Sequence, residues 1–148
     1  MNRQIMFAYG SNMLQAQALE RMPFAIKIGT GELINHAFKF SGNGVASVFK
    51  SSQSSVPGVI YSVTKEDIEC MNLYEGYPKV YNSYYLPIKF NKEKLNALVY
   101  VNNTKKIILP PKQEYLNKIL NGASNNNISN SHIINAYNFA LKLLNNTK

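Results

Sequence analysis

The chain has 148 residues, of which 45% are hydrophobic, so it is long and apolar enough to bury one core, and this excludes wholesale disorder. No apolar run approaches the roughly 20 residues that a membrane-spanning helix requires, and the N-terminal residues carry no small-residue cleavage site, so we expect neither a membrane segment nor a signal peptide. Cys70 is the only cysteine, which excludes an internal disulfide and a cysteine-rich metal site and favours a cytoplasmic location.

The formal net charge is +8, but the lysines are scattered along the chain and arginine is nearly absent. Proteins that read nucleic acids gather basic residues on one face and rely on arginine for bidentate contacts with bases. We therefore expect no nucleic-acid partner and no membrane partner, while attraction of small anions stays open. The sequence contains no internal repeat and no sign of a second domain, so we predict a single domain over residues 1–148.

The first half of the chain predicts a strand, a helix and a group of strands. The apolar run "QIMFAY" (residues 4–9) is followed by glycine and indicates a buried first strand. The stretch "MLQAQALERM" (residues 13–22) is rich in helix formers and predicts a helix that Pro23 ends. Between residues 25 and 63, four short apolar pieces separated by Gly, Asn, Ser and Pro predict successive antiparallel strands in a sheet or barrel.

The segment "TKEDIECMNLYEG" predicts a second helix with marked ends. Thr64 and Asp67 have the spacing of a capping box, with Asp in place of the usual Glu, and Gly76 suits the left-handed position that follows a helix. Glu75 would then be the last helical residue. Helical spacing indicates which side chains face the core: Ile68, Met71 and either Leu73 or Tyr74.

The last part of the chain predicts two strands and two helices. "VYNSYYLPIKF" (residues 80–90) and "LNALVYVNN" (residues 95–103) have the composition of strands. "QEYLNKIL" (residues 113–120) and "SHIINAYNFALKLL" (residues 131–144) have that of helices. The polar stretch "NGASNNNISNS" (residues 121–131) joins them, and we expect it to form a mobile loop.

The segment Tyr9-Gly10-Ser11-Asn12 is the first candidate site. A strand that turns through glycine into a helix directs several free backbone N–H groups at one spot, where the helix dipole also favours an anion such as a carboxylate. Gly10 permits close approach of a ligand, and Ser11 and Asn12 can contact the ligand or cap the helix. Judged on these four residues alone, a simple N-cap is the favoured interpretation.

Better-known catalytic and phosphate-binding motifs are absent. The sequence has no G-x-x-x-x-G-K-[ST] motif, and "GTGELI" has Ile34 where a dinucleotide-binding motif needs its third glycine. Ser11 lacks the G-x-S-x-G context of a nucleophile, and only His36 and His132 could serve it as a base.

Glu75 is the second candidate. A carboxylate at the C-terminal end of a helix meets the negative end of the helix dipole, and the neighbouring sequence is rich in apolar and aromatic residues. Both effects raise the pKa of a carboxyl group toward the range in which it exchanges a proton near neutral pH. An ordinary exposed glutamate is the more common alternative at such a position.

Four motifs in order make the chain resemble the gamma-glutamylcyclotransferase family, also called AIG2-like. They are "YGSNM" at the end of the first strand, "GVASVF" with "VPGVIYSV", the Glu-Gly pair followed by Tyr81, and "PPKQEYLNKILNGA" before the terminal helix. The resemblance covers nearly the whole chain. It implies an α+β fold, a small mixed β-barrel flanked by helices, with the ligand pocket at one end of the barrel.

The resemblance also implies an activity and a set of site residues. A gamma-glutamyl group would cyclise to 5-oxoproline without a cofactor or a metal, so the expected partner is a small gamma-glutamyl substrate. Glu75 matches the family's catalytic acid/base. Substrate binding is expected from the loop and two tyrosines: Tyr9, Gly10, Ser11, Asn12, Met13, Tyr81 and Tyr115.

One position departs from the family pattern, and several alternatives stay open. The family usually has Leu-Asp where this chain has Met71-Asn72, and we expect that Asp to be a supporting residue. The leaving group is expected to contact variable loops such as residues 121–131, and an amino acid, an amine and a biosynthetic intermediate all fit. A non-catalytic binding or regulatory module with the same pocket is the alternative function.

Overall fold

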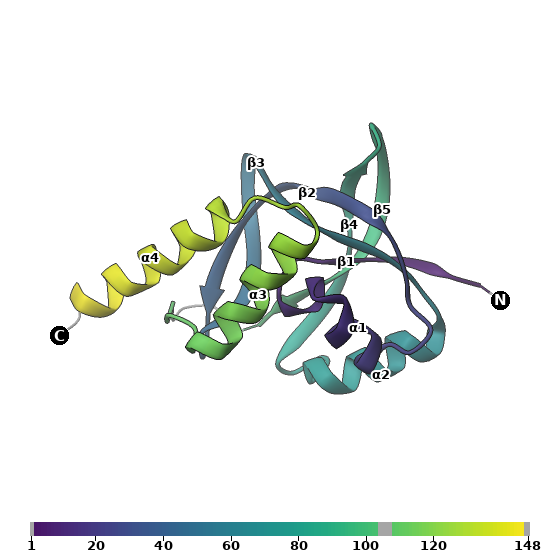
Figure 1. Cartoon of the computed structure of the whole chain (residues 1–148), viewed down its shortest axis with the longest axis horizontal. Coiled ribbons are helices and arrows are strands. Elements are labelled where there is room, and N and C mark those ends of the chain that lie inside the picture. The colour runs from purple at the N-terminus through teal and green to yellow at the C-terminus, as the bar shows by residue number, and fades with distance from the viewer. Residues whose placement is uncertain (1, 104–107, 147–148) are drawn as a thin grey trace.

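The computed structural model describes residues 2–103 and 108–146, which form a closed five-stranded barrel with helices around it (Figure 1). The strands are β1 (Gln4–Ala8), β2 (Ile26–Ser41), β3 (Val45–Val63), β4 (Tyr81–Phe90) and β5 (Glu93–Asn102). The helices are the 3₁₀-helix η1 (Ser11–Met13) and the α-helices α1 (Gln15–Arg21), α2 (Lys65–Glu75), α3 (Gln113–Asn125) and α4 (Ser131–Asn146). The barrel order is β1-β3-β2-β4-β5, and β1 closes it by pairing parallel to β5 while the other pairs are antiparallel. The expected mixed barrel is therefore confirmed.

The segment expected to form several short strands folds as one long hairpin, so that prediction was wrong. β2 pairs with β3 along most of its length, with register shifts between Lys27 and Gly29 and between Ile34 and His36. These irregularities absorb the polar and glycine residues that we interpreted as turns, because a bulge bends a strand without ending it. The one reversal lies between Ser41 and Val45, where two glycines have positive φ angles.

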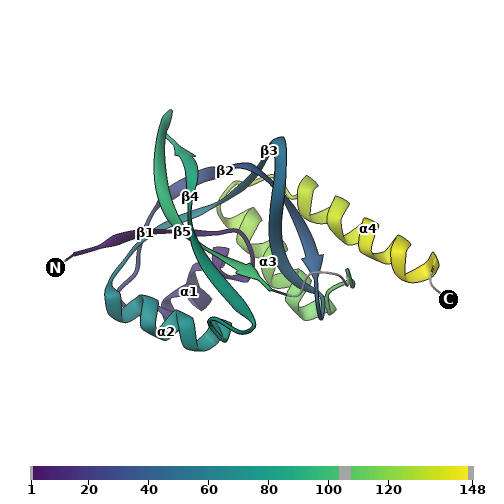
Figure 2. The same ribbon diagram turned by 180° about the vertical axis from the view of Figure 1, so that it is seen from behind.

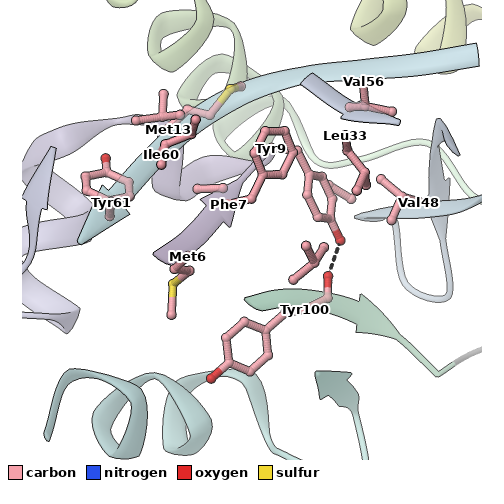
Figure 3. Close-up of a cluster of buried hydrophobic side chains, with 14 of the residues drawn as sticks. Met6, Phe7, Tyr9, Met13, Leu33, Val48, Val56, Ile60, Tyr61 and Tyr100 are labelled. Atoms are coloured by element: carbon pink, nitrogen blue, oxygen red, sulfur yellow. Dashed lines mark hydrogen bonds between the residues drawn. The ribbon is translucent and has the colours of Figure 1, made fainter. Parts of the chain in front are cut away.

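The core of the barrel is built from alternating side chains of the strands and from residues under the loop that follows β1. Figure 3 shows Phe7 of β1 near Ile60 and Tyr61 of β3. Residues 4–8 of β1 pair with residues 59–63 of β3, which sets Phe7 directly opposite Ile60 and Met6 directly opposite Tyr61. The largest fully buried side chains are Tyr61, Phe40, Met13, Met22, Leu33 and Ile60.

The helix expected over residues 13–22 is divided in two. η1 occupies residues 11–13, Leu14 is extended with ψ of 107°, and α1 begins only at Gln15. Neither Ser11 nor Asn12 caps a helix through its side chain, so the N-cap interpretation was wrong. α1 ends at Arg21, two residues before Pro23, as the proline led us to expect.

Both ends of α2 match the sequence prediction. The Thr64 hydroxyl accepts a hydrogen bond from the N–H of Asp67 at 3.2 Å, and the Asp67 carboxylate accepts one from the N–H of Thr64 at 3.0 Å, which confirms the capping box. Gly76 is left-handed, with φ of 64°, and its N–H donates to the carbonyl of Leu73. Glu75 is therefore the last helical residue, as predicted.

The buried face of α2 differs from the expected one. Met71 is buried as predicted, but Leu73 and Tyr74 are 85% and 62% exposed, so that part of the prediction was wrong. Asp67 and Met71 lie four residues apart on the inner face, and Glu75 comes four residues later. Because residues four apart share one face of a helix, Glu75 continues the buried stripe whereas Leu73 and Tyr74 point elsewhere.

The connection between α3 and α4 is much shorter than the loop expected over residues 121–131. α3 continues to Asn125, because its last turns pack tightly under the loop that follows β1. A Cβ atom on Gly122 would lie 2.8 Å from the nitrogen of Leu14, and the Asn126 side-chain amide donates to the carbonyl of Met13 at 2.9 Å. The expectation of a mobile loop was therefore wrong for the helical part of this segment.

The helices gather in two groups around the barrel. Figures 1 and 2 show α1 and α2 side by side on one part of it, and α3 and α4 on another, with α4 extending outward toward the C-terminus. In residues 2–103 and 108–146, no helix combines the length and the apolar character that crossing a membrane requires.

Candidate active site

A cavity of about 690 Å³ lies where the end of β1, the C-terminal end of α2 and the beginning of α3 meet. Its volume is within the range of small-molecule sites, which is about 300–1,000 Å³. Seven of the eight residues predicted from the sequence line it: Tyr9, Gly10, Ser11, Asn12, Glu75, Tyr81 and Tyr115. The eighth, Met13, is fully buried in the core and does not line the cavity, so its assignment to the binding surface was wrong.

The loop after β1 forms one wall of this cavity and lies close to β3. A Cβ atom on Gly10 would approach the Cβ of Ala46 to 3.3 Å and the Tyr115 hydroxyl to 3.8 Å, so glycine lets the loop lie against these groups. The N–H of Met13 donates to the carbonyl of Gly10 at 3.0 Å, which closes the turn of η1. The first N–H groups of a helix have no acceptor within it, and those of this turn belong to residues that line the cavity.

The polar side chains of the loop are held by α1. The Gln17 side-chain amide donates to the Ser11 hydroxyl at 2.6 Å and to the Asn12 side-chain oxygen at 3.2 Å. The Arg21 guanidinium donates to the same Asn12 oxygen at 3.2 Å. The Asn12 carbonyl accepts from the Tyr61 hydroxyl at 2.9 Å. The loop is thus fixed by contacts on both its side chains and its backbone before any ligand enters.

Glu75 lines the same cavity as this loop. It is half-buried, and burial raises the pKa of its carboxyl group because the charged form loses hydration. The positive charge of Arg21 acts in the opposite direction, with a smaller effect on the pKa of Glu75. The desolvation expected from the sequence is present; of the apolar and aromatic neighbours, Tyr74 and Tyr81 line the same cavity as Glu75, whereas Leu73 is exposed.

Three tyrosine hydroxyls converge near the first residues of β3. β1 pairs only with residues 59–63 of β3. Near the start of β3, two tyrosine side chains form hydrogen bonds with the backbone of Ala46. The N–H of Ala46 donates to the Tyr115 hydroxyl at 3.0 Å, and its carbonyl accepts from the Tyr81 hydroxyl at 2.8 Å. Burial raises the pKa of Tyr115 to about 12 and raises those of Tyr9 and Tyr81. All three hydroxyls are therefore protonated near neutral pH and present fixed dipoles to the cavity.

Asn72, the departure from the family pattern, supports the site through Tyr100. The Tyr100 hydroxyl donates to the Asn72 side-chain oxygen at 2.5 Å. The Tyr9 hydroxyl in turn donates to the Tyr100 carbonyl, the dashed line in Figure 3. An amide oxygen accepts a hydrogen bond as a carboxylate does, but it adds no negative charge beside Glu75.

The residues that sequence reasoning missed come from α1, β5 and the start of α3. Gln17 and Arg21 have the i, i+4 spacing of one helix face, which was a usable signal, whereas nothing local marked Tyr100. The beginning of α3 contributes a polar wall: Lys112, Gln113, Glu114, Tyr115 and Lys118. None of the cavity-lining residues comes from 121–131, where we expected leaving-group contacts; residues 121–125 are instead the end of α3, which packs under the loop after β1.

Comparison with known proteins agrees with this geometry. The family model described as "Gamma-glutamyl cyclotransferase, AIG2-like" matches residues 6–122. Over an alignment of 138 residues the chain is 26% identical to "Gamma-glutamylcyclotransferase" from Bos taurus, which covers 82% of this chain and 71% of that protein. The chain therefore belongs to the gamma-glutamyl cyclotransferase, AIG2-like family.

Solved structures show the same fold. One entitled "Gamma-glutamyl cyclotransferase" superimposes with a TM-score of 0.79 and 22% identity, covering 84% of this chain and 80% of that one. YkqA from Bacillus subtilis also gives a TM-score of 0.79, with 18% identity, over 93% of this chain and 55% of YkqA. At these identities the likeness concerns the fold.

Proposed function

We propose that the protein is a gamma-glutamylcyclotransferase that converts a gamma-glutamyl compound into 5-oxoproline and a free amine or amino acid. The substrate's alpha-nitrogen attacks its own gamma-carbonyl carbon, a new C–N bond closes the five-membered ring, and the C–N bond to the leaving amine breaks. One proton leaves the attacking nitrogen and one is delivered to the leaving nitrogen, so the reaction needs no other reactant.

Glu75 is the group that moves these protons. The observation that carries the proposal is the position of this carboxyl in the same cavity as residues 9–12, together with its raised pKa. A free alpha-amino group has a pKa of about 7.7–8.0, so a base with a pKa raised toward neutrality is suited to deprotonate it and then to act as the acid.

The remaining groups bind and bend the substrate. The backbone N–H groups of residues 10–12 suit the alpha-carboxylate. The neutral hydroxyl of Tyr115, which accepts from the N–H of Ala46, suits the carbonyl oxygen as it gains negative charge. Holding the chain curled brings the two reacting atoms together, and such intramolecular reactions reach effective molarities of roughly 10⁵–10⁸ M. Fixed hydrogen bonds of the loop to Gln17 and Arg21 favour this function, because preorganised groups need no rearrangement during the reaction.

Gamma-glutamyl amino acids, gamma-glutamyl amines and gamma-glutamylated biosynthetic intermediates are the proposed substrate classes. We propose incubating the protein with a panel of gamma-glutamyl dipeptides, gamma-glutamyl amines and glutathione, with 5-oxoproline measured by mass spectrometry. Release of 5-oxoproline from one class identifies the leaving group. Binding of the panel without release from any member would favour the non-catalytic module.

The variant Glu75→Gln tests the role of the carboxyl directly. It keeps the size of the side chain but cannot accept a proton, so we expect turnover to fall about 10²–10⁴-fold, the usual contribution of general acid–base catalysis, while substrate binding measured by calorimetry persists. Glu69→Gln on the exposed face of α2 is the matched control and should retain wild-type turnover. Near-normal turnover in Glu75→Gln would refute the assignment.

A further inference from the structure

A second cavity, of about 570 Å³, lies between α4 and the β2–β3 hairpin. It shares no lining residue with the first cavity. Its lining includes four phenylalanines: Phe38 and Phe40 from β2, Phe49 from β3 and Phe139 from α4. Phe49 and Phe139 are 43% and 52% exposed, so their rings lie at the opening of the cavity, whereas Phe38 and Phe40 are buried. Figure 2 shows α4 running beside the ends of β2 and β3 that enclose this space.

His132 gives this cavity a polar atom that needs a partner. Its ring meets that of Phe38 edge-on, with centroids 5.4 Å apart and an interplanar angle of 90°. The Nε2 atom is buried and has no hydrogen-bond partner within residues 2–103 and 108–146. Buried polar atoms in folded proteins are nearly always paired, so an orphaned one requires an explanation. Burial lowers the pKa of His132, which leaves a neutral imidazole with one donor and one acceptor nitrogen.

The charge at the opening is positive. Lys39 lines the cavity, and its ammonium group lies 5.5 Å from the centre of the Phe49 ring. The cavity-lining residues in the described part of the chain include no aspartate or glutamate. A ligand that satisfies all three features has an aromatic ring for the phenylalanines, an oxygen for His132, and a negative charge for Lys39.

We propose that this second cavity is a binding site for a small aromatic carboxylate. The ring packs against Phe49 and Phe139, whose rings are exposed, one carboxylate oxygen accepts a hydrogen bond from His132, and the charge lies near Lys39. The proposal is independent of the reaction in the first cavity, so a failure of either leaves the other standing.

The probe for this site is 3-phenylpropionate, titrated into the wild-type protein by calorimetry and by two-dimensional NMR. We expect saturable binding of one molecule per chain, with the shifted resonances around His132 and Phe139. Affinity should be about 10-fold weaker for the neutral 3-phenylpropanamide and weaker still for propionate, since each removes one of the interactions. The same affinity in Glu75→Gln would separate this site from the proposed reaction.

Two variants and one control assign the contacts. Lys39→Gln should reduce the affinity for 3-phenylpropionate to that for the amide, and Phe139→Ala should weaken all aromatic probes, while exposed Lys27→Gln on the same strand should change neither. Absence of saturable binding, an equal loss in Lys27→Gln, or shifts confined to residues 9–12 and α2 would overturn the proposal. Sedimentation that showed a dimer broken by Phe139→Ala would overturn it too, because the face would then be an interface between two copies.

Discussion

The two cavities of this protein treat their polar groups in opposite ways. In the first, the hydroxyls and amides of Ser11, Asn12 and Tyr81 already have partners within the protein. In the second, the Nε2 atom of His132 is buried without one in the described part of the chain. The first cavity is therefore a preorganised site with one partly desolvated carboxyl, whereas the second contains a buried nitrogen with an unmet hydrogen bond. Changes to polar groups should have opposite effects in the two places.

Among the changes that compare the two cavities, the largest effect is expected from Gly10→Val. A Cβ atom already meets Ala46 at 3.3 Å, and the two extra methyl groups would displace the loop from β3. A displacement of about 1 Å in a positioning group lowers turnover about 100-fold, which 5-oxoproline release would measure. Ala16→Val on exposed α1 is the control. If the two cavities are separate sites, Gly10→Val should leave the binding of 3-phenylpropionate in the second cavity unchanged. Loss of that binding in Gly10→Val would contradict their separation.

The second prediction concerns stability. Tyr81→Phe removes the donor that pairs the Ala46 carbonyl, so a buried acceptor is left without this partner. We expect the free energy of unfolding, from urea denaturation, to fall by about 1–3 kcal/mol. Tyr84→Phe on an exposed part of β4 should leave it unchanged. An unchanged free energy of unfolding in Tyr81→Phe would mean that the hydrogen bond from Tyr81 to Ala46 does not stabilise the cavity wall.

His132→Phe is the opposite experiment in the other cavity. It replaces an imidazole that has an unpaired buried nitrogen by an apolar ring of similar shape, so stability should rise by about 1 kcal/mol, measured by the same denaturation. The Nδ1–H of His36 donates to the Ile34 carbonyl at 2.9 Å, so His36→Phe should bring no such gain. Destabilisation by His132→Phe would indicate that Nε2 has a partner in solution.

The smallest effect is a shift in pH dependence for Asn72→Asp. Residues three apart on a helix lie about 5–6 Å apart, so the new carboxylate raises the pKa of Glu75 further by like-charge repulsion. Glu75 acts as a base only when ionised, so the acid limb of the kcat/KM profile should move to higher pH. Asn72→Ala removes the acceptor for Tyr100 without adding charge, and should lower activity without that upward shift. A downward shift in Asn72→Asp would contradict the assignment of the limb to Glu75.

Local sequence signals predicted local structure well. The capping box at Thr64 and Asp67 and the left-handed Gly76 depend on residues within one turn, and together they placed Glu75 at the end of α2. The order of the motifs predicted the barrel, and the loop after β1 and Glu75 do line one cavity. Their roles in binding and catalysis stay predictions that the variants above test.

The parts that could not be predicted depend on contacts between distant segments. The way α2 lies on the barrel decides whether Leu73 or Glu75 faces inward. From the composition of the helix alone, we predicted that the apolar Leu73 or Tyr74 faces the core, and both are exposed. Asn35 has a positive φ angle that keeps β2 running through a polar stretch, and a sequence pattern cannot distinguish such a bulge from a turn. Tyr100 enters the site only because β5 passes next to β1 at the closure of the barrel.

The two cavities are separated by a pair of aromatic side chains. Tyr9, in the wall of the first, meets Phe38, in the wall of the second, edge to face with ring centroids 6.2 Å apart. Protein interiors are packed as densely as organic crystals, so a ring displaced on one side has little free volume to enter on the other. Substitutions of Tyr9 or Phe38 themselves are therefore the ones expected to affect both spaces, whereas a change elsewhere in either wall is expected to act on that wall alone.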